Sequence, residues 1–145
     1  MAPAAPHATL ATRTRLRAAR APLLVAGGAA VLALGLVLRD PHQQGSWGVC
    51  PLYALTGTYC AGCGGLRATH DLLVGDLAGA WGANPLWVVV VPVLVALWVR
   101  WLVGALRAGR RAAVPPATVA LGIGAAIVLY SVARNVPAWA GVLAP

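Results

Sequence analysis

All three cysteines of the chain lie within 14 consecutive positions. They are Cys50, Cys60 and Cys63, in the spacing C-x9-C-x2-C. Thiolates act as nucleophiles, as redox groups and as ligands of soft metal ions, so this segment is where chemistry would take place. Cysteines that serve only as small apolar side chains would not be expected to gather in this way.

Three interpretations fit the spacing. In the first, Cys60 and Cys63 form a C-x-x-C pair that exchanges disulfides, helped by a helix that starts after Cys63. In the second, the three thiolates bind zinc with a fourth ligand, for which His70 is the natural candidate and His42 an outside one. In the third, two cysteines form a structural disulfide, which leaves one thiol over. The sequence leaves all three open.

Polar residues follow the cysteines at helical spacing. Cys63, Arg67, His70 and Asp71 stand at i, i+4, i+7 and i+8, so one helix face could present all four. Arg67 and Asp71 are four positions apart and are predicted to form a local ion pair. No Ser-His-Asp or paired-carboxylate arrangement can be built from three acids and three histidines. The sequence therefore predicts no catalytic residues, and an enzyme is not favoured.

An apolar stripe predicts a short amphipathic helix over about 64–81. It is interrupted at Gly75-Asp76, and it is too short and too charged to span a bilayer. We therefore expect it to lie in the membrane interface or to form a re-entrant element. Asn84 is predicted to cap the helix that begins at Pro85.

The composition is that of a membrane protein. Of 145 residues, 60% are hydrophobic and only 10% are charged, and the mean hydropathy is +0.78. A chain this short could not bury so much apolar surface in one core, and its hydrophobicity excludes disorder. All 11 basic side chains are arginines, placed at the edges of apolar runs rather than on one basic face. This pattern predicts contact with a lipid bilayer and no nucleic-acid binding.

Three apolar runs predict three transmembrane helices. They cover residues 21–38, 85–106 and 116–133. The first could belong to a signal peptide, but it is longer than a typical apolar region and lacks a cleavage site, so we favour a retained helix. A role as a transporter subunit gains no support, because no apolar run has an acid or a histidine at its middle, as an ion or proton path would usually need.

Arginine counts predict the orientation. The tail of residues 1–20 carries four arginines, and the short loop of residues 107–115 carries Arg107, Arg110 and Arg111. Both segments should be cytoplasmic, with a cytoplasmic N-terminus in the plasma membrane. The cysteine loop of residues 39–84 and the tail of residues 134–145 should then face outward.

A string of residues in and after the cysteine loop resembles a known family. The string consists of Cys50-Pro51, Thr56-Gly57, Cys60-x-Gly62-Cys63-Gly64-x-x-Arg67, Gly75-Asp76, Ala80 and Asn84-Pro85. It is similar to the bacterial membrane family Domain of Unknown Function 2752, over roughly 50–99. The family commonly has proline after the second cysteine, where this chain has Ala61. The resemblance implies a membrane location and a functional role for the cysteine loop, but it implies no particular activity. The arginine-rich, lysine-free composition also resembles proteins of high-GC actinobacteria.

The sequence thus predicts an all-α integral membrane protein with three transmembrane helices and an outward cysteine loop. The favoured function is an interaction or structural module for a membrane-protein partner, with a loop stabilised by a disulfide or by zinc. The alternative is a thiol-redox or metal-handling protein that uses Cys60 and Cys63. The predicted site residues are the three cysteines and His70 as metal ligands, with Arg67, Asp71, Asp76 and Asn84 as polar residues of the motif.

Overall fold

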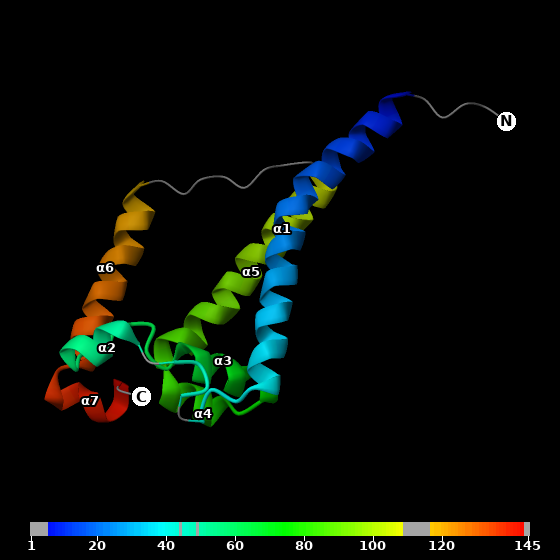
Figure 1. Ribbon diagram of the computed structural model, residues 1–145. Coiled ribbons are helices and arrows are strands. Elements are labelled where there is room, and N and C mark those ends of the chain that lie inside the picture. Colours follow the sequence, from blue (N-terminus) through cyan, green and yellow to red (C-terminus); the bar gives the residue numbers. More distant parts are fainter. Residues whose placement is uncertain (1–5, 44, 49, 109–116, 144–145) are drawn as a thin grey trace. The chain divides into compact units, whose positions relative to one another are not determined.

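The computed structural model describes residues 6–43, 45–48, 50–108 and 117–143, and this part of the chain is entirely helical, without strands (Figure 1). Its seven helices are α1 (Pro6–Leu38), α2 (Pro51–Thr56), α3 (Gly65–Val74), α4 (Leu77–Ala83), α5 (Pro85–Ala108), α6 (Ala117–Arg134) and α7 (Pro137–Leu143). The predicted all-α fold is confirmed. Arg110 and Arg111 of the predicted basic loop lie outside the described residues.

Three of these helices are long and apolar enough to cross a membrane. The segments are Thr12–Leu38, Pro85–Arg107 and Ala117–Arg134. Even the shortest, with 18 residues, is about 27 Å long at a rise of 1.5 Å per residue, which is close to the hydrocarbon thickness of about 30 Å. Nearly all of their side chains lie on the surface, as expected for helices that face lipid. The three predicted spans are confirmed as candidate membrane helices.

The first helix extends further towards the N-terminus than the predicted span. It includes the arginines that we assigned to a polar tail, because alanine and arginine both favour the helical conformation. Pro22 and Pro92 lie inside α1 and α5, where membrane helices tolerate proline.

The described chain divides into two compact units. The first comprises residues from 1–31 and 92–114. Within it, the indole Nε1 of Trp98 donates a hydrogen bond of 2.9 Å to the carbonyl oxygen of Pro22. Pro22 is fully buried, and this bond joins α1 to α5.

The second unit, made of residues from 32–91 and 115–145, contains the cysteine loop. The segment predicted as one helix over about 64–81 forms two helices, α3 and α4, which pack against each other. The break falls at Gly75, which adopts a left-handed conformation (φ +87°). Asp76 then caps α4, because its carboxylate accepts a hydrogen bond from the backbone N–H of Gly79 at 2.9 Å. The hairpin is therefore fixed by its own turn residues.

A small core holds this hairpin against the start of α5. Ala68, Ala80 and Ala83 are buried, and larger apolar side chains such as Trp87 pack on them. The indole Nε1 of Trp87 donates to the hydroxyl of Thr69 at 2.7 Å. Alanines allow the helices to approach closely, as is common where membrane helices pack.

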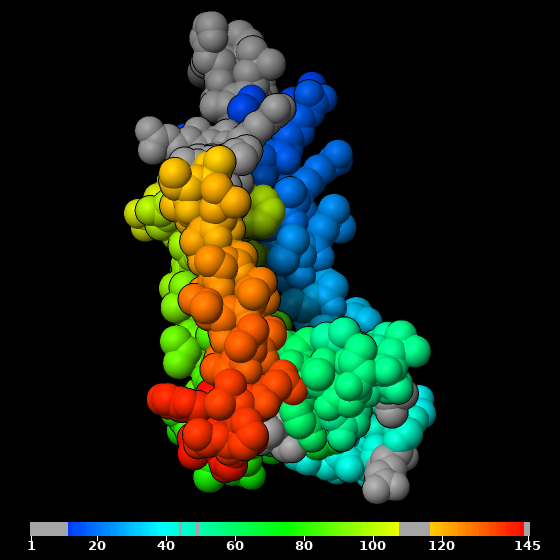
Figure 2. Space-filling view, turned by 90° about the vertical axis from the view of Figure 1, so that its left-hand side faces the viewer, coloured from blue at the N-terminus to red at the C-terminus, as the bar shows by residue number. Residues whose placement is uncertain are grey.

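Two short helices were not expected from the sequence. Both α2 and α7 begin with a proline, Pro51 and Pro137, at the first helical position, where its fixed φ and missing N–H are tolerated. α2 ends at Gly57, which is left-handed. Figure 2 shows α7, in red, packed beside the end of α6, in orange.

Candidate functional site

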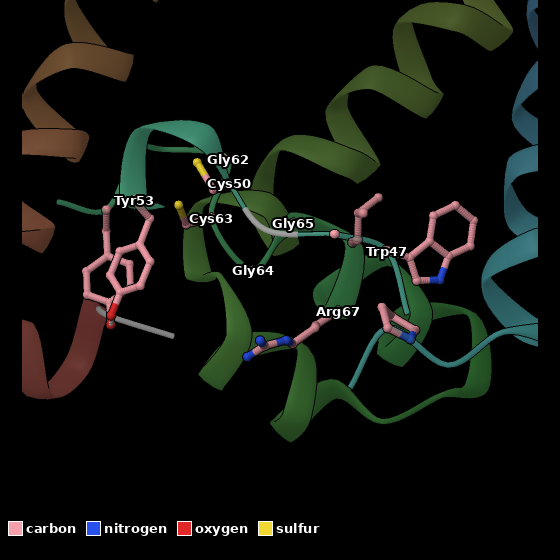
Figure 3. A pocket seen from close by; sticks show the side chains of 12 residues that line it. Trp47, Cys50, Tyr53, Gly62, Cys63, Gly64, Gly65 and Arg67 are labelled. Atoms are coloured by element: carbon pink, nitrogen blue, oxygen red, sulfur yellow. Dashed lines mark hydrogen bonds between the residues drawn. The ribbon is translucent and has the colours of Figure 1, made fainter. Parts of the chain in front are cut away.

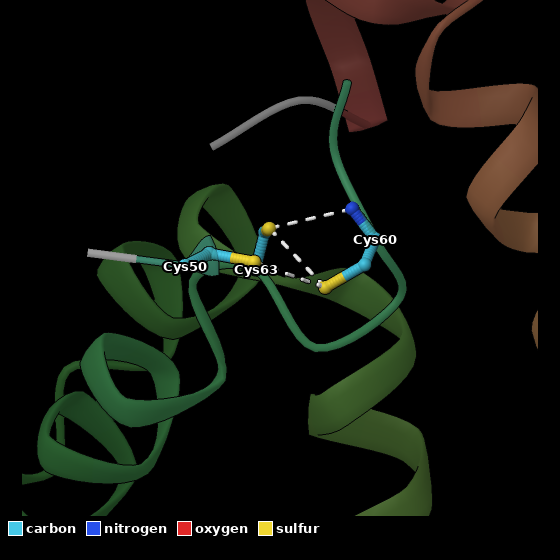
Figure 4. A group of neighbouring side chains, drawn as sticks. All are labelled: Cys50, Cys60 and Cys63. Atoms are coloured by element: carbon cyan, nitrogen blue, oxygen red, sulfur yellow. Dashed lines mark hydrogen bonds between the residues drawn. The ribbon is translucent and has the colours of Figure 1, made fainter. Parts of the chain in front are cut away.

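The three cysteine sulfurs meet at one point of the loop (Figure 4). The Sγ atoms of Cys50, Cys60 and Cys63 all lie within 4.8 Å of one another. The Sγ of Cys60 is 3.8 Å from that of Cys50 and 3.3 Å from that of Cys63. All three are free thiols in the structure. Cys63 is buried, whereas Cys50 and Cys60 are half-buried.

Local backbone structure brings the thiols together. Cys50 immediately precedes α2, and Cys60 and Cys63 bracket a tight turn in which the N–H of Cys63 donates to the carbonyl of Cys60 at 3.1 Å. The backbone N–H of Cys60 in turn donates to the Sγ of Cys63 at 3.3 Å. Gly64 follows as the N-cap of α3, with a φ of +80°, a conformation that glycine adopts without strain.

A buried arginine holds this turn from the end of α6. Arg134 has no solvent exposure, although no acidic side chain pairs with it in the described part of the chain. Its Nη1 donates to the carbonyl oxygens of Cys60 and Cys63 at 3.0 and 2.8 Å, and its Nε donates to that of Leu143 at 2.7 Å. The guanidinium also lies 5.4 Å from the centre of the Tyr130 ring. A positive charge is therefore fixed at the backbone of the cysteine turn.

Two further contacts tie the turn to α6. The backbone N–H of Ala61 donates to the hydroxyl of Ser131 at 3.0 Å. Asn135 binds the backbone of Tyr59 twice: its Oδ1 accepts from the N–H and its Nδ2 donates to the carbonyl, each at 2.8 Å. A proline after Cys60 could not make the first of these bonds, because it has no N–H.

Asn84 joins the turn to the start of α5. It is fully buried, and its Nδ2 donates to the carbonyls of Ala61 and Cys63 at 2.8 and 3.1 Å. Its Oδ1 accepts from the backbone N–H of Trp87 at 3.1 Å, which is the capping role that the sequence predicted. The same oxygen accepts from the hydroxyl of Tyr130 at 3.2 Å. Asn84 thus has a partner for both ends of its amide.

The thiols differ in acidity. Burial, together with the hydrogen bond with Cys60, raises the pKa of Cys63 to about 12. In contrast, a hydrogen bond from the backbone of Tyr53 lowers the pKa of the Cys50 thiol. The hydroxyl of Tyr53 and partial burial raise the pKa of Tyr59. A metal ion that binds Cys63 as a thiolate would therefore displace a proton from it.

A pocket of about 470 Å³ opens beside the thiols (Figure 3). Cys50 and Cys63 belong to its wall, and the side chain of Arg67 lies on another part of it. Its lining consists of Pro41, Trp47, Gly48, Cys50, Tyr53, Tyr59, Gly62, Cys63, Gly64, Gly65, Leu66 and Arg67. Cys60 is not part of the lining, so Cys50 and Cys63 are the two cysteines that contribute to the wall of this pocket.

His70, the predicted fourth ligand, lies elsewhere. It is not a member of the thiol cluster, and its Nδ1 lies 2.9 Å from the carbonyl oxygen of Leu36. A carbonyl only accepts hydrogen bonds, so Nδ1 carries the proton. Its Nε2 lies 3.9 Å from the Oδ1 of Asp40. The helix turns this residue towards α1 rather than towards the cysteines.

Arg67 and Asp71 do not form the expected ion pair. Asp71 is buried, and its Oδ1 lies 2.7 Å from the Nε2 of His42. Its Oδ2 has no hydrogen-bond partner among the described residues. Arg67 is exposed and lines the pocket, without an acidic partner in the described chain. The i, i+4 spacing describes contacts within one helix only. Tertiary packing instead places His42, from the loop after α1, beside this carboxylate.

Sequence reasoning missed the residues that hold the turn. Ser131, Arg134 and Asn135 lie at the end of an apolar run, where an arginine is usually a headgroup anchor. One signal was present: Arg134 is a basic residue on the side of the membrane that the arginine count predicts to be outside.

Comparison with known proteins agrees with the motif. No curated protein and no solved structure matches the chain. One family model does, and it covers residues 50–98, from the first cysteine into α5. This segment contains the three thiols, Arg67 and Asn84, whereas Arg134 lies beyond it. The resemblance seen in the sequence is therefore confirmed: residues 50–98 match the family DUF2752, which is described as a protein of unknown function.

Proposed function

We propose that the protein is a membrane metal-binding protein that holds one zinc ion through Cys50, Cys60 and Cys63. The convergence of all three sulfurs within 4.8 Å carries this proposal. The zinc ion orders the loop on the outward side of the plasma membrane and so presents it to a membrane-protein partner. This role combines the stabilised module and the metal-binding loop that the sequence suggested.

The sulfur positions suit a metal better than a disulfide staple. Tetrahedral ligands at a Zn–S distance of about 2.3 Å lie about 3.8 Å from one another. The Sγ of Cys60 stands 3.8 and 3.3 Å from its two neighbours. A structural disulfide would join two cysteines and would not explain why the third sulfur lies beside them. A common ligand explains why all three converge.

The charge around the thiols supports the same proposal. Three thiolates and one divalent cation carry a net charge of minus one, which a buried site must compensate. Arg134 supplies a buried positive charge without an acidic partner among the described side chains, and it donates to the carbonyls of two of the ligands. The metal centre would thus give this arginine its counter-charge.

Disulfide exchange is the second candidate function, because the Sγ atoms of Cys60 and Cys63 are only 3.3 Å apart. In that case the Cys60–Cys63 pair would cycle between dithiol and disulfide, and Cys50 would be the thiol that attacks or resolves it. The same experiment distinguishes the two functions.

The test is metal analysis of the full chain, purified anaerobically in detergent. We expect one zinc per chain, and each of Cys50→Ser, Cys60→Ser and Cys63→Ser should remove most of it, since the loss of one ligand commonly collapses such a site. His70→Ala is the matched control, because His70 lies outside the cluster, and it should keep its zinc. Metal-free protein with a Cys60–Cys63 disulfide would instead support the redox function and refute the zinc site.

A further inference from the structure

We propose that the fourth coordination position of the metal takes a small-molecule thiol that also carries a carboxylate, with the carboxylate bound by Arg67. This inference rests on the proposed zinc site and names its ligand. The observation behind it is that the thiol cluster and an arginine without an acidic partner share one pocket.

The protein provides three ligands for a metal that prefers four. In the described chain, no histidine, aspartate or glutamate joins the three cysteines. Zinc sites with three protein ligands keep their fourth position for water or substrate. Cys50 and Cys63 line the pocket while Cys60 does not, so the open position would face into the pocket.

The sulfur ligands determine which donor would bind there. Soft thiolate ligands select zinc, so a metal ion held by three thiolates suits a soft fourth ligand. A fourth thiolate would complete a four-sulfur ligand set, which is common in zinc sites. On binding, the incoming thiol loses its proton to solvent, and its sulfur displaces the water on the metal. No electrons are transferred in this step.

Arg67 determines the second group of the ligand. It is exposed, lines the pocket and has no acidic partner among the described residues. A guanidinium binds a carboxylate through two parallel hydrogen bonds. Arg67 also lies in the first turn of α3, whose N-terminal dipole favours an anion. Arg134, in contrast, is already engaged with backbone carbonyls behind the cysteines.

The size of the pocket agrees with such a ligand. Pockets of roughly 300–1,000 Å³ typically hold small molecules, and this one measures about 470 Å³. The stacked rings of Tyr53 and Tyr59, 4.7 Å apart, give the pocket an aromatic wall.

The experiment uses the full chain in detergent with Co²⁺ in place of zinc, under anaerobic conditions. The probes are mercaptoacetate, which has both groups, and 2-mercaptoethanol, which has only the thiol. Titration should change the visible spectrum of bound Co²⁺ with either probe, and mercaptoacetate should bind more tightly. Arg67→Ala should weaken mercaptoacetate binding by about tenfold or more, the effect of one charged hydrogen bond, and leave 2-mercaptoethanol unchanged. Arg39→Ala, an exposed loop arginine outside the pocket lining, is the matched control and should change neither.

Each other outcome overturns a different statement. If the wild-type protein binds no Co²⁺, the proposed function fails and the ligand with it. If Co²⁺ binds but neither thiol changes its spectrum, the zinc site stands and the open fourth position is refuted. If both thiols bind with equal affinity, or Arg67→Ala and Arg39→Ala behave alike, the role of Arg67 is refuted.

Discussion

Arg134 donates a hydrogen bond of 2.8 Å to the carbonyl oxygen of Cys63, across 71 positions of the sequence. The arginine ends an apolar helix, and the cysteine ends the C-x-x-C turn. Because Arg134 is fully buried, this contact places a cation against the backbone of the cysteine turn. The geometry of the cysteine turn therefore depends on a residue outside the segment that matches the family.

Replacement of Arg134 should disorder the turn. Arg134→Met keeps the length of the side chain but removes the donors to Cys60, Cys63 and Leu143. Since hydrogen bonds from charged groups contribute about 1.5–3 kcal/mol each, we expect the free energy of unfolding to fall by at least about 3 kcal/mol. The measurement is thermal unfolding in detergent, together with zinc content.

Arg100→Met is the matched control, because Arg100 is exposed on α5. It should change stability by less than about 0.5 kcal/mol, as is usual for surface substitutions. Equal behaviour of the two variants would contradict the role given to Arg134.

Ala61 offers a test of the departure from the family pattern. Ala61→Pro introduces the residue that the family resemblance implies at this position, but it removes the N–H that donates to Ser131. We expect it to destabilise the protein by about 1 kcal/mol, the net contribution of one hydrogen bond. The loss should be smaller when Ala61→Pro is made in a Ser131→Ala background, where the acceptor is already gone. An Ala61→Pro variant as stable as the wild type would show that the bond contributes nothing.

The buried carboxylate of Asp71 should depend on His42. His42→Ala leaves Oδ1 without its partner, while Oδ2 has none among the described residues. A buried charge without a partner is costly, so we expect the variant to lose on the order of 2 kcal/mol in the free energy of unfolding at pH 7. Adding Asp71→Asn, which removes the charge, should recover part of this loss. If the double variant is no more stable than His42→Ala, the buried charge is not the cause.

The predicted orientation can be measured directly. The arginine-rich segments should be cytoplasmic and the cysteine loop outward. Reporter proteins fused after Asp76 and after Gly109 should therefore report opposite compartments. Reporters in the same compartment would contradict a chain that crosses the membrane between these positions, and with it the outward position of the cysteines.

The sequence predicted the parts of the structure that depend on neighbouring residues. Three apolar runs predicted three candidate spans, and Asn84 before Pro85 predicted a helix cap. The sequence also indicates the interruption at Gly75-Asp76, but it predicts one helix where the structure has two. In each case a local preference of the backbone or of one side chain determines the result.

Contacts between distant segments could not be predicted. Asp71 pairs with His42 rather than with Arg67 because the loop between α1 and α2 brings His42 to it. The helical periodicity of the sequence does not describe the path of that loop. His70 satisfied the spacing of a ligand, yet the orientation of α3 places it against the carbonyl of Leu36. Arg134 resembled a headgroup anchor because its partners are backbone carbonyls, which no residue pattern reveals.

X-ray absorption at the zinc edge of the anaerobically purified protein identifies the ligands of the proposed zinc ion. We expect at least three sulfur ligands per zinc at about 2.3 Å, and no scattering from an imidazole ring. A zinc ion with a histidine ligand, or with fewer than three sulfurs, would contradict it. So would a protein without zinc whose mass shows that two of its three thiols are joined in a disulfide.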